Sequence, residues 1–122
     1  MLRLSHAIVF VGDMSRSVAF YRDLLGLSLR FESPEWSEFE TGDTTLALHA
    51  AEAPSKPAHG PPPAGACHVG LTVDDLDAFH ARLVAQGVRC VRPPKLEQFG
   101  AKLAVYLDPD GLGVSVSGPH GG

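Results

Sequence analysis

The stretch His6-Ala-Ile-Val-Phe-Val-Gly-Asp13 returns 62 residues later, in divergent form, as His68-Val-Gly-Leu-Thr-Val-Asp-Asp75. Each copy is a run of apolar and β-branched residues that ends in a carboxylate suited to cap a helix. Apolar side chains at helical spacing follow each copy, and glycine then ends both patterns, at Gly26 and Gly87. In the first half these side chains are Met14, Val18, Tyr21 and Leu25. The sequence therefore predicts a strand followed by a helix, twice.

Both halves continue with strand-like runs around a turn. The first half has Glu38–His49, and the second has Tyr106–Ser117, which matches it at an offset of 68 residues. Asp108–Gly111 has the proline and glycine spacing of a type I turn followed by a left-handed residue. Shorter strands are predicted at 27–32 and 88–91. Each half thus has the order β-α-β-β-β, which predicts an α+β fold built from two tandem modules.

Glycine and proline make up 13 and 10 of the 122 residues; they cluster in a linker and at the end of the chain, and most of the others mark turns and helix ends. Residues 53–65 hold five of the ten prolines, and proline fixes φ and removes a backbone donor, so a linker is predicted there. The first module is then 1–52, the second 66–118, and the tail 119–122. A module of this size buries only about 60% of its surface and is marginal alone. We therefore expect paired modules and a homodimer.

Charge and hydropathy exclude several classes of protein. The formal net charge is −4, whereas a nucleic-acid binder is normally basic. The first apolar run, Ala7–Val11, is too short for a secretory signal or a spanning helix. Two cysteines make neither a disulfide framework nor a zinc knuckle. A cytoplasmic protein is predicted, with no nucleic acid and no membrane among its partners.

This pattern resembles the vicinal oxygen chelate superfamily, which contains glyoxalase I, bleomycin-resistance proteins, extradiol dioxygenases and fosfomycin-resistance enzymes. The matching segments are His6, Val11–Asp13, Ser17–Leu27, Leu46–His49, His68–Leu71 and Asp108–Gly111. The resemblance covers about residues 3–117. It implies curved mixed sheets that enclose a cavity, with modules paired within one chain or swapped between the two chains of a homodimer.

The resemblance also implies metal-ligand positions, which here hold His6, Ala47, His68 and Ser115. Ala47 cannot coordinate a metal, and Ser115 is a poor ligand where the family usually has Glu. His49 points the same way as Ala47, but it lies about 6–7 Å further along the strand. Two hypotheses stay open, a metal-free pocket and a weak or non-standard metal site at His6 and His68. No cofactor is certain; the resemblance implies a divalent metal, Zn, Ni, Mn or Fe.

The predicted pocket follows from strand alternation. If His6 faces the cavity, every second residue of its strand does too, and the same holds beyond His68. Phe39 joins them because it matches Leu107 at the offset of 68, so Glu38 and Glu40 are predicted on the opposite face, solvated or covered by a helix. The predicted ligand-binding residues are Ile8, Phe10, Trp36, Phe39, His49, Gly70, Val105 and Ser115.

Three functions compete. The first is a small-molecule-binding protein that holds its ligand between paired modules, as the resemblance to the bleomycin-resistance branch implies. The alternative is a divalent-metal-dependent lyase, isomerase, transferase or dioxygenase that uses His6 and His68. Whether the chain is an enzyme stays open, and no catalytic residue is assigned. The third is a structural module with a filled cavity, which the small residues Ala47, Gly70, Gly113 and Ser115 disfavour.

Overall fold

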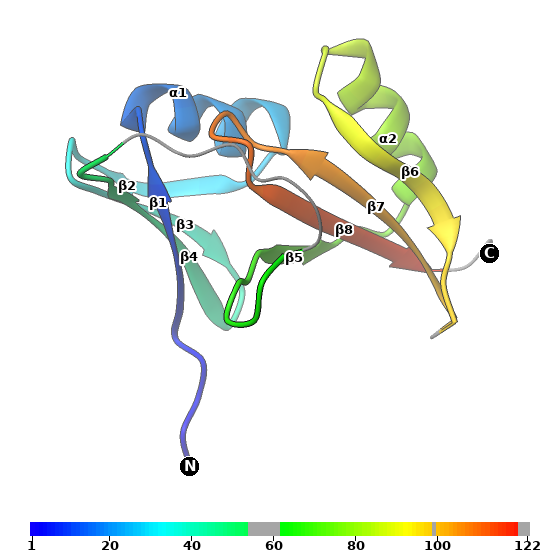
Figure 1. The fold of residues 1–122 in the computed structure, drawn as a ribbon, viewed down its shortest axis with the longest axis horizontal. Helices are drawn as coiled ribbons and strands as arrows, with labels where there is room; N and C mark the ends of the chain where they lie inside the picture. Colours follow the sequence, from blue (N-terminus) through cyan, green and yellow to red (C-terminus); the bar gives the residue numbers. More distant parts are fainter. Residues whose placement is uncertain (54–61, 99, 120–122) are drawn as a thin grey trace. The chain divides into compact units, whose positions relative to one another are not determined.

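The computed structural model describes residues 1–53, 62–98 and 100–119. It divides into two compact units, Met1–Pro57 and Ala58–Gly122 (Figure 1). Each unit contains one four-stranded mixed sheet and helical segments that contact it. The α+β fold of two βαβββ modules is therefore confirmed. Residues 54–61 of the predicted linker and 120–122 of the predicted tail lie outside the described residues.

The first unit has the strand order β1-β4-β3-β2, with β1 parallel to β4 and the other pairs antiparallel. Its elements are β1 (His6–Val11), α1 (Met14–Ala19), the π-helical segment η1 (Phe20–Leu24), β2 (Ser28–Glu32), β3 (Trp36–Thr41) and β4 (Thr44–Ala50). Asp13 caps α1, because its Oδ1 accepts a hydrogen bond from the backbone N–H of Arg16 at 3.0 Å. The predicted helix is thus present, but its second half widens into a π-turn.

The second unit repeats this topology in the order β5-β8-β7-β6, with β5 parallel to β8. Its elements are β5 (Val69–Thr72), α2 (Leu76–Ala85), β6 (Cys90–Leu96), β7 (Ala101–Leu107) and β8 (Gly113–Pro119). Asp75 caps α2 through a hydrogen bond from the N–H of Ala78 at 3.0 Å. None of the helices in the described part of the chain is long and apolar enough to cross a membrane.

In each unit the core includes side chains from one face of the sheet, from the helical segment that contacts it and from the residues just after that segment. Those of the first unit are Val9, Val11, Val18, Phe20, Tyr21, Leu25, Phe39, Leu46 and Leu48. Those of the second are Leu76, Leu83, Val88, Ala104, Tyr106, Val114 and Val116. Burial raises the pKa of Tyr106 to about 12, and its hydroxyl lies 2.9 Å from Nδ1 of His80. Tyr106 is therefore a neutral core residue.

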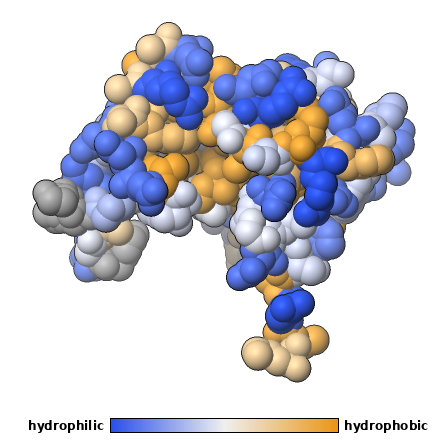
Figure 2. Space-filling view, turned by 180° about the vertical axis from the view of Figure 1, so that it is seen from behind, coloured by the Kyte–Doolittle hydropathy of each residue, from blue (hydrophilic) through white to orange (hydrophobic). Residues whose placement is uncertain are grey.

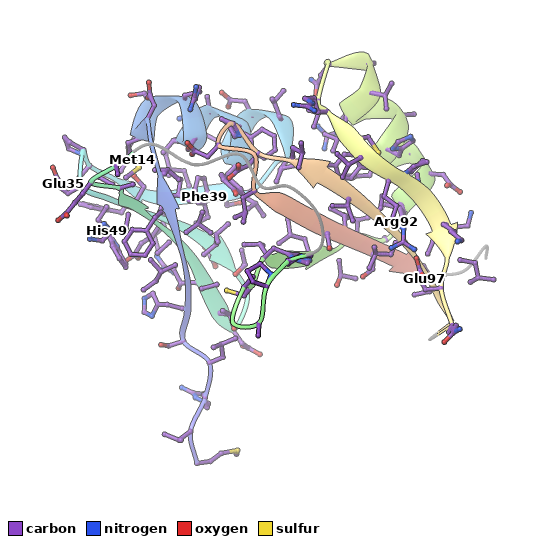
Figure 3. The ribbon with its side chains drawn as sticks, in the orientation of Figure 1. Met14, Glu35, Phe39, His49, Arg92 and Glu97 are labelled. Atoms are coloured by element: carbon purple, nitrogen blue, oxygen red, sulfur yellow. The ribbon has the colours of Figure 1, made fainter. Side chains whose placement is uncertain are left out.

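Phe39 belongs to this core, so its predicted place on the ligand-binding face is wrong. Its side chain is 0% exposed, and its ring centroid lies 6.0 Å from that of Tyr21. In Figure 3 the labelled Phe39 lies toward α1, whereas His49 lies on the side of the sheet away from that helix. Residues next to Phe39 on β3 consequently point to the other face.

The length of one hairpin connection explains this difference. Leu46 and Val114 are 68 residues apart, but their partners Phe39 and Tyr106 are only 67 apart. The second hairpin thus has one residue more in its connection than the first. Because a shift of one residue moves a strand side chain to the opposite face, matching Phe39 to Leu107 reversed its orientation.

Candidate functional site

The sheet of the first unit has one face in the core and one face directed away from α1. Strand pairing places three residues from each of β1, β3 and β4 on that outer face. They are His6, Ile8, Phe10, Trp36, Glu38, Glu40, Thr45, Ala47 and His49, and we call them the open face. Ile8 and Phe10 are 49% and 62% exposed, although both are large apolar side chains. On the side of the molecule that Figure 2 shows, orange apolar residues reach the surface among blue hydrophilic ones.

Four rings form a row along the open face. The ring centroids of His6 and Trp36 are 6.2 Å apart, and those of Trp36 and His49 are 6.0 Å apart with their planes at 90°. His49 then lies 5.0 Å from Phe10. Strand register contributes to this row, because Trp36 pairs with His49 across β3 and β4, and His49 pairs with Phe10 across β4 and β1. Sequence reasoning selected all four residues, and the structure brings them together.

Glu38 lies on the open face and fixes the orientation of Trp36, although the sequence predicted it on the opposite face. Its Oε2 accepts a hydrogen bond from Nε1 of Trp36 at 2.8 Å. Its Oε1 accepts from Nε and Nη2 of Arg30 at 3.1 and 2.8 Å, and Nη2 also donates to Oγ1 of Thr45 at 2.7 Å. The hydrogen bonds from Trp36 and then Arg30 hold the pKa of Glu38 below its usual range. Glu38 is thus an ionised carboxylate that holds the indole ring of Trp36 in place through a hydrogen bond.

Tryptophan fluorescence can report the ionisation of Glu38, because Trp36 is the only tryptophan of the chain. The lowered pKa means that this carboxylate contributes stability above the ordinary glutamate pKa, and that the contribution is lost as the pH falls through the lower folded value. We expect the emission of the wild-type protein to change in that acid range. The Glu38→Gln variant should lack the change, because the amide does not titrate.

Both proteins keep His6 and His49, so any effect of imidazole protonation on the emission is common to the two curves. Circular dichroism over the same range identifies global unfolding. Superimposable acid-range fluorescence curves for the two folded proteins would contradict the contact between Glu38 and Trp36.

The backbone carbonyl of Ala50 fixes the hydrogen-bonding role of each ring nitrogen of His49. Its Nδ1 lies 2.7 Å from the backbone carbonyl oxygen of Ala50. A carbonyl oxygen only accepts hydrogen bonds, so Nδ1 carries the hydrogen and Nε2 of the neutral ring is an acceptor. Within the described residues the imidazole of His49 makes no second hydrogen bond. The open face therefore offers a hydrogen-bond acceptor between Trp36 and Phe10.

The predicted site residues of the second half also share one sheet face. Gly70 pairs with Ser115 across β5 and β8, and Ser115 pairs with Val105 across β8 and β7. His68 directly precedes β5, and its Nε2 lies 2.8 Å from Oγ of Ser115. A Cβ added to Gly70 would meet nothing within 4 Å, so space is open in front of this strand. The role of these residues in ligand binding stays a prediction.

The positions that the family resemblance implies as metal ligands do not hold a donor set that fits a divalent metal. Ala47 offers only a methyl group, and Ser115 is a neutral hydroxyl that is hydrogen-bonded to His68. Two imidazoles, His6 and His68, remain. Across 1–53, 62–98 and 100–119, no three or more His, Cys, Asp or Glu side chains form a group able to hold a metal ion. Divalent metals need more ligands than this set supplies.

Two βαβββ modules with these sheet orders define the class of protein, and similarity to known proteins leads to the same class. The chain belongs to the Glyoxalase/Bleomycin resistance protein/Dioxygenase superfamily, whose family model matches residues 3–116. It is 30% identical over 119 residues to the uncharacterized protein YaeR of Escherichia coli (strain K12), covering 90% of this chain and 91% of that one. It is 32% identical over 110 residues to the glutathione transferase FosA of Serratia marcescens, covering 88% and 74%.

A solved structure gives the same fold. The crystal structure of SMU.1112c matches with a TM-score of 0.84 and 23% sequence identity, covering 96% of this chain and 98% of that one. The predicted family and fold are therefore confirmed.

Sequence reasoning missed Arg30 and placed Glu38 on the wrong face. Arg30 gave no signal, because a lone arginine on a short strand is normally a solvated surface residue. Glu38 could have been placed correctly from the connection between Thr41 and Thr44, which leaves two residues between paired strands, the length of a tight hairpin. That length sets the register and hence the face of every β3 side chain.

Proposed function

We propose that this chain is a small-molecule-binding protein of the superfamily that binds its ligand on the open face without a resident metal. The observation that supports this most is the row of rings formed by His6, Trp36, His49 and Phe10. Ligand sites combine apolar and aromatic surface with a few fixed polar groups, and this face has both. Large exposed apolar side chains grouped in one place are also typical of binding surfaces.

The second sheet contributes to the same proposal. Gly70, Val105 and Ser115 are proposed as further ligand-binding residues, because they combine open space, an apolar wall and a hydroxyl on one face. The homodimer also stays a proposal, which rests on the small size of each module. The incomplete metal-ligand positions favour binding over metal chemistry.

The test is a binding screen on the intact chain. A panel of planar aromatic and matched aliphatic compounds is titrated by two-dimensional NMR, with the indole N–H of Trp36 and the amides of β1, β3 and β4 as reporters. Aromatic compounds should shift these signals, and Phe10→Ala should weaken binding by roughly tenfold, as expected for a lost aromatic contact. Val84→Ala is the control, because Val84 is similarly exposed, at 53%, but lies on α2.

A chelator should leave the affinities unchanged. The proposal is overturned if the aromatic compounds shift signals only elsewhere in the chain, or if binding disappears with the chelator.

The alternative is a divalent-metal-dependent enzyme, which the 32% identity to a glutathione transferase supports. It requires Zn, Ni, Mn or Fe in stoichiometric amount, lost in His68→Ala. Elemental analysis of both proteins, each incubated with these metals and then dialysed, separates the two functions. Retention of one metal per chain by the wild type alone would favour the enzyme.

A further inference from the structure

We infer that the ligand of the open face is a planar, uncharged aromatic compound with an N–H or O–H group at its edge, and that Nε2 of His49 accepts the hydrogen bond from this group. The inference rests on the proposed function, because it concerns the same face. It adds the chemical class of the ligand and the atom that selects it.

The charged groups beside the rings are already paired with one another. Both carboxylate oxygens of Glu38 accept hydrogen bonds, one from Trp36 and one from Arg30. Arg30 additionally donates to Thr45. The indole N–H of Trp36 is used in the same way, so it is not free to bind a ligand. A charged ligand group would have to compete with these charge-assisted hydrogen bonds, which are the stronger kind.

Glu40 is the other charged side chain of the open face, and it is exposed to solvent. It lies four residues from Trp36 along β3 and pairs with Thr45, whereas Trp36 pairs with His49. Four residues of strand span about 13 Å. Glu40 is therefore well separated from the part of the row where His49 and Phe10 meet, and that part favours uncharged ligands.

The acceptor is assigned to His49 and not to His6. Nδ1 of His49 must donate to the carbonyl of Ala50, which leaves Nε2 as an acceptor. His6 has no such restriction, because its Nδ1 contacts the hydroxyl of Ser5, which can donate or accept. A ligand that donates a hydrogen bond is thus matched by one defined atom, and that atom lies in the ring row.

The extent of the row indicates the shape of the ligand. The rings come from β1, β4 and β3, which are successive neighbours in the sheet. Neighbouring strands lie about 4.8 Å apart, so the part of the row formed by Phe10, His49 and Trp36, which pair across these strands, extends over on the order of 10 Å. A fused two-ring compound is of this size, and its flat faces suit ring contacts with Phe10 and Trp36.

The test compares indole with 1-methylindole, which has the same ring system but no donor. Both are titrated against the intact chain by NMR. We expect indole to bind about tenfold more tightly, as for one added hydrogen bond. His49→Phe keeps a ring without the acceptor, so this preference should vanish in it. His6→Phe is the matched control and should keep the preference. Tryptamine and indole-3-acetate, which carry opposite charges, should bind no more tightly than indole.

The outcomes separate this inference from the proposed function. Binding of both indoles to the open face with equal affinity overturns the donor inference and leaves the proposed function in place. If no aromatic compound shifts the open-face signals, the proposed function itself fails. A preference for indole that persists in His49→Phe overturns the assignment to His49, and tighter binding of a charged analogue overturns the neutral class.

A second measurement does not depend on any variant. The nitrogen-15 resonance of Nε2 of His49 in the wild-type protein should move to lower frequency with indole and not with 1-methylindole. The reason is that only indole can donate a hydrogen bond to the lone pair of this nitrogen. An unmoved resonance at saturating indole overturns the inference.

Discussion

Phe39→Ala is expected to lower the free energy of unfolding by about 3–5 kcal/mol, the cost of removing a buried aromatic ring. The Phe39 side chain is 0% exposed and lies against Tyr21, so its loss leaves a cavity between the sheet and η1. Urea denaturation followed by circular dichroism measures the effect. The large value is expected because neither the sheet nor the helical segment can close the gap without losing other contacts.

Phe10→Ala is the matched control on the same sheet. Phe10 is 62% exposed and lies on the open face, so its truncation should change the free energy of unfolding by less than about 1 kcal/mol. The two variants should reverse their order in the ligand screen, where Phe10→Ala weakens binding. Similar losses of stability for the two variants would show that the two faces of β1 and β3 are assigned wrongly.

The repeated module could be predicted from the sequence because its signals are local. Asp13 and Asp75 precede apolar helical patterns, and both cap a helix in the structure through the backbone N–H three residues later. Each βαβββ order follows from the period of the apolar residues and from the turns between them. Such signals do not depend on how strands pair, so they survive the divergence of the two halves.

The faces predicted for β3 are wrong because they depend on register, which follows from the length of the hairpin connection and not from the apolar pattern. A connection longer by one residue in the second hairpin is invisible in the apolar pattern, yet it exchanges the places of Glu38 and Phe39. The π-turn in the first helical segment was also not predictable from the apolar pattern. The N–H of Leu25 bonds to the carbonyl of Phe20, five residues back, and a continuous helical pattern does not distinguish this from an α-helix.

The polar contacts of the candidate site lay beyond sequence reasoning for another reason. The hydrogen bonds from Trp36 and Arg30 to Glu38 join side chains of two strands, and the role of His49 depends on one backbone carbonyl. Trp36 and Glu38 are two residues apart on β3, but no spacing in the sequence indicates the contacts with Arg30 or with the carbonyl of Ala50. The four rings were selected as separate residues, and only the pairing of β1, β4 and β3 shows that they form one row.

Gly118→Ala is expected to lower the free energy of unfolding by about 1–3 kcal/mol, the range for an overpacked site. A Cβ at this position would lie 2.9 Å from Cβ of Leu76 and 3.2 Å from the carbonyl oxygen of Val73. Neither atom can rotate away, and Leu76 begins α2 and is 3% exposed. The helix would therefore have to move relative to β8. Chemical denaturation measures the loss.

Gly70→Ala is the control, because a Cβ there meets nothing within 4 Å and neither glycine has a positive φ. Its stability should stay within about 0.5 kcal/mol of the wild-type value. The first unit carries Ala50 at the position 68 residues before Gly118, and Ala50 pairs with Val11 in β1. The first half thus accepts a Cβ where the second does not, so the close approach of α2 to β8 distinguishes the two modules. An equal effect of both glycine substitutions would contradict that packing.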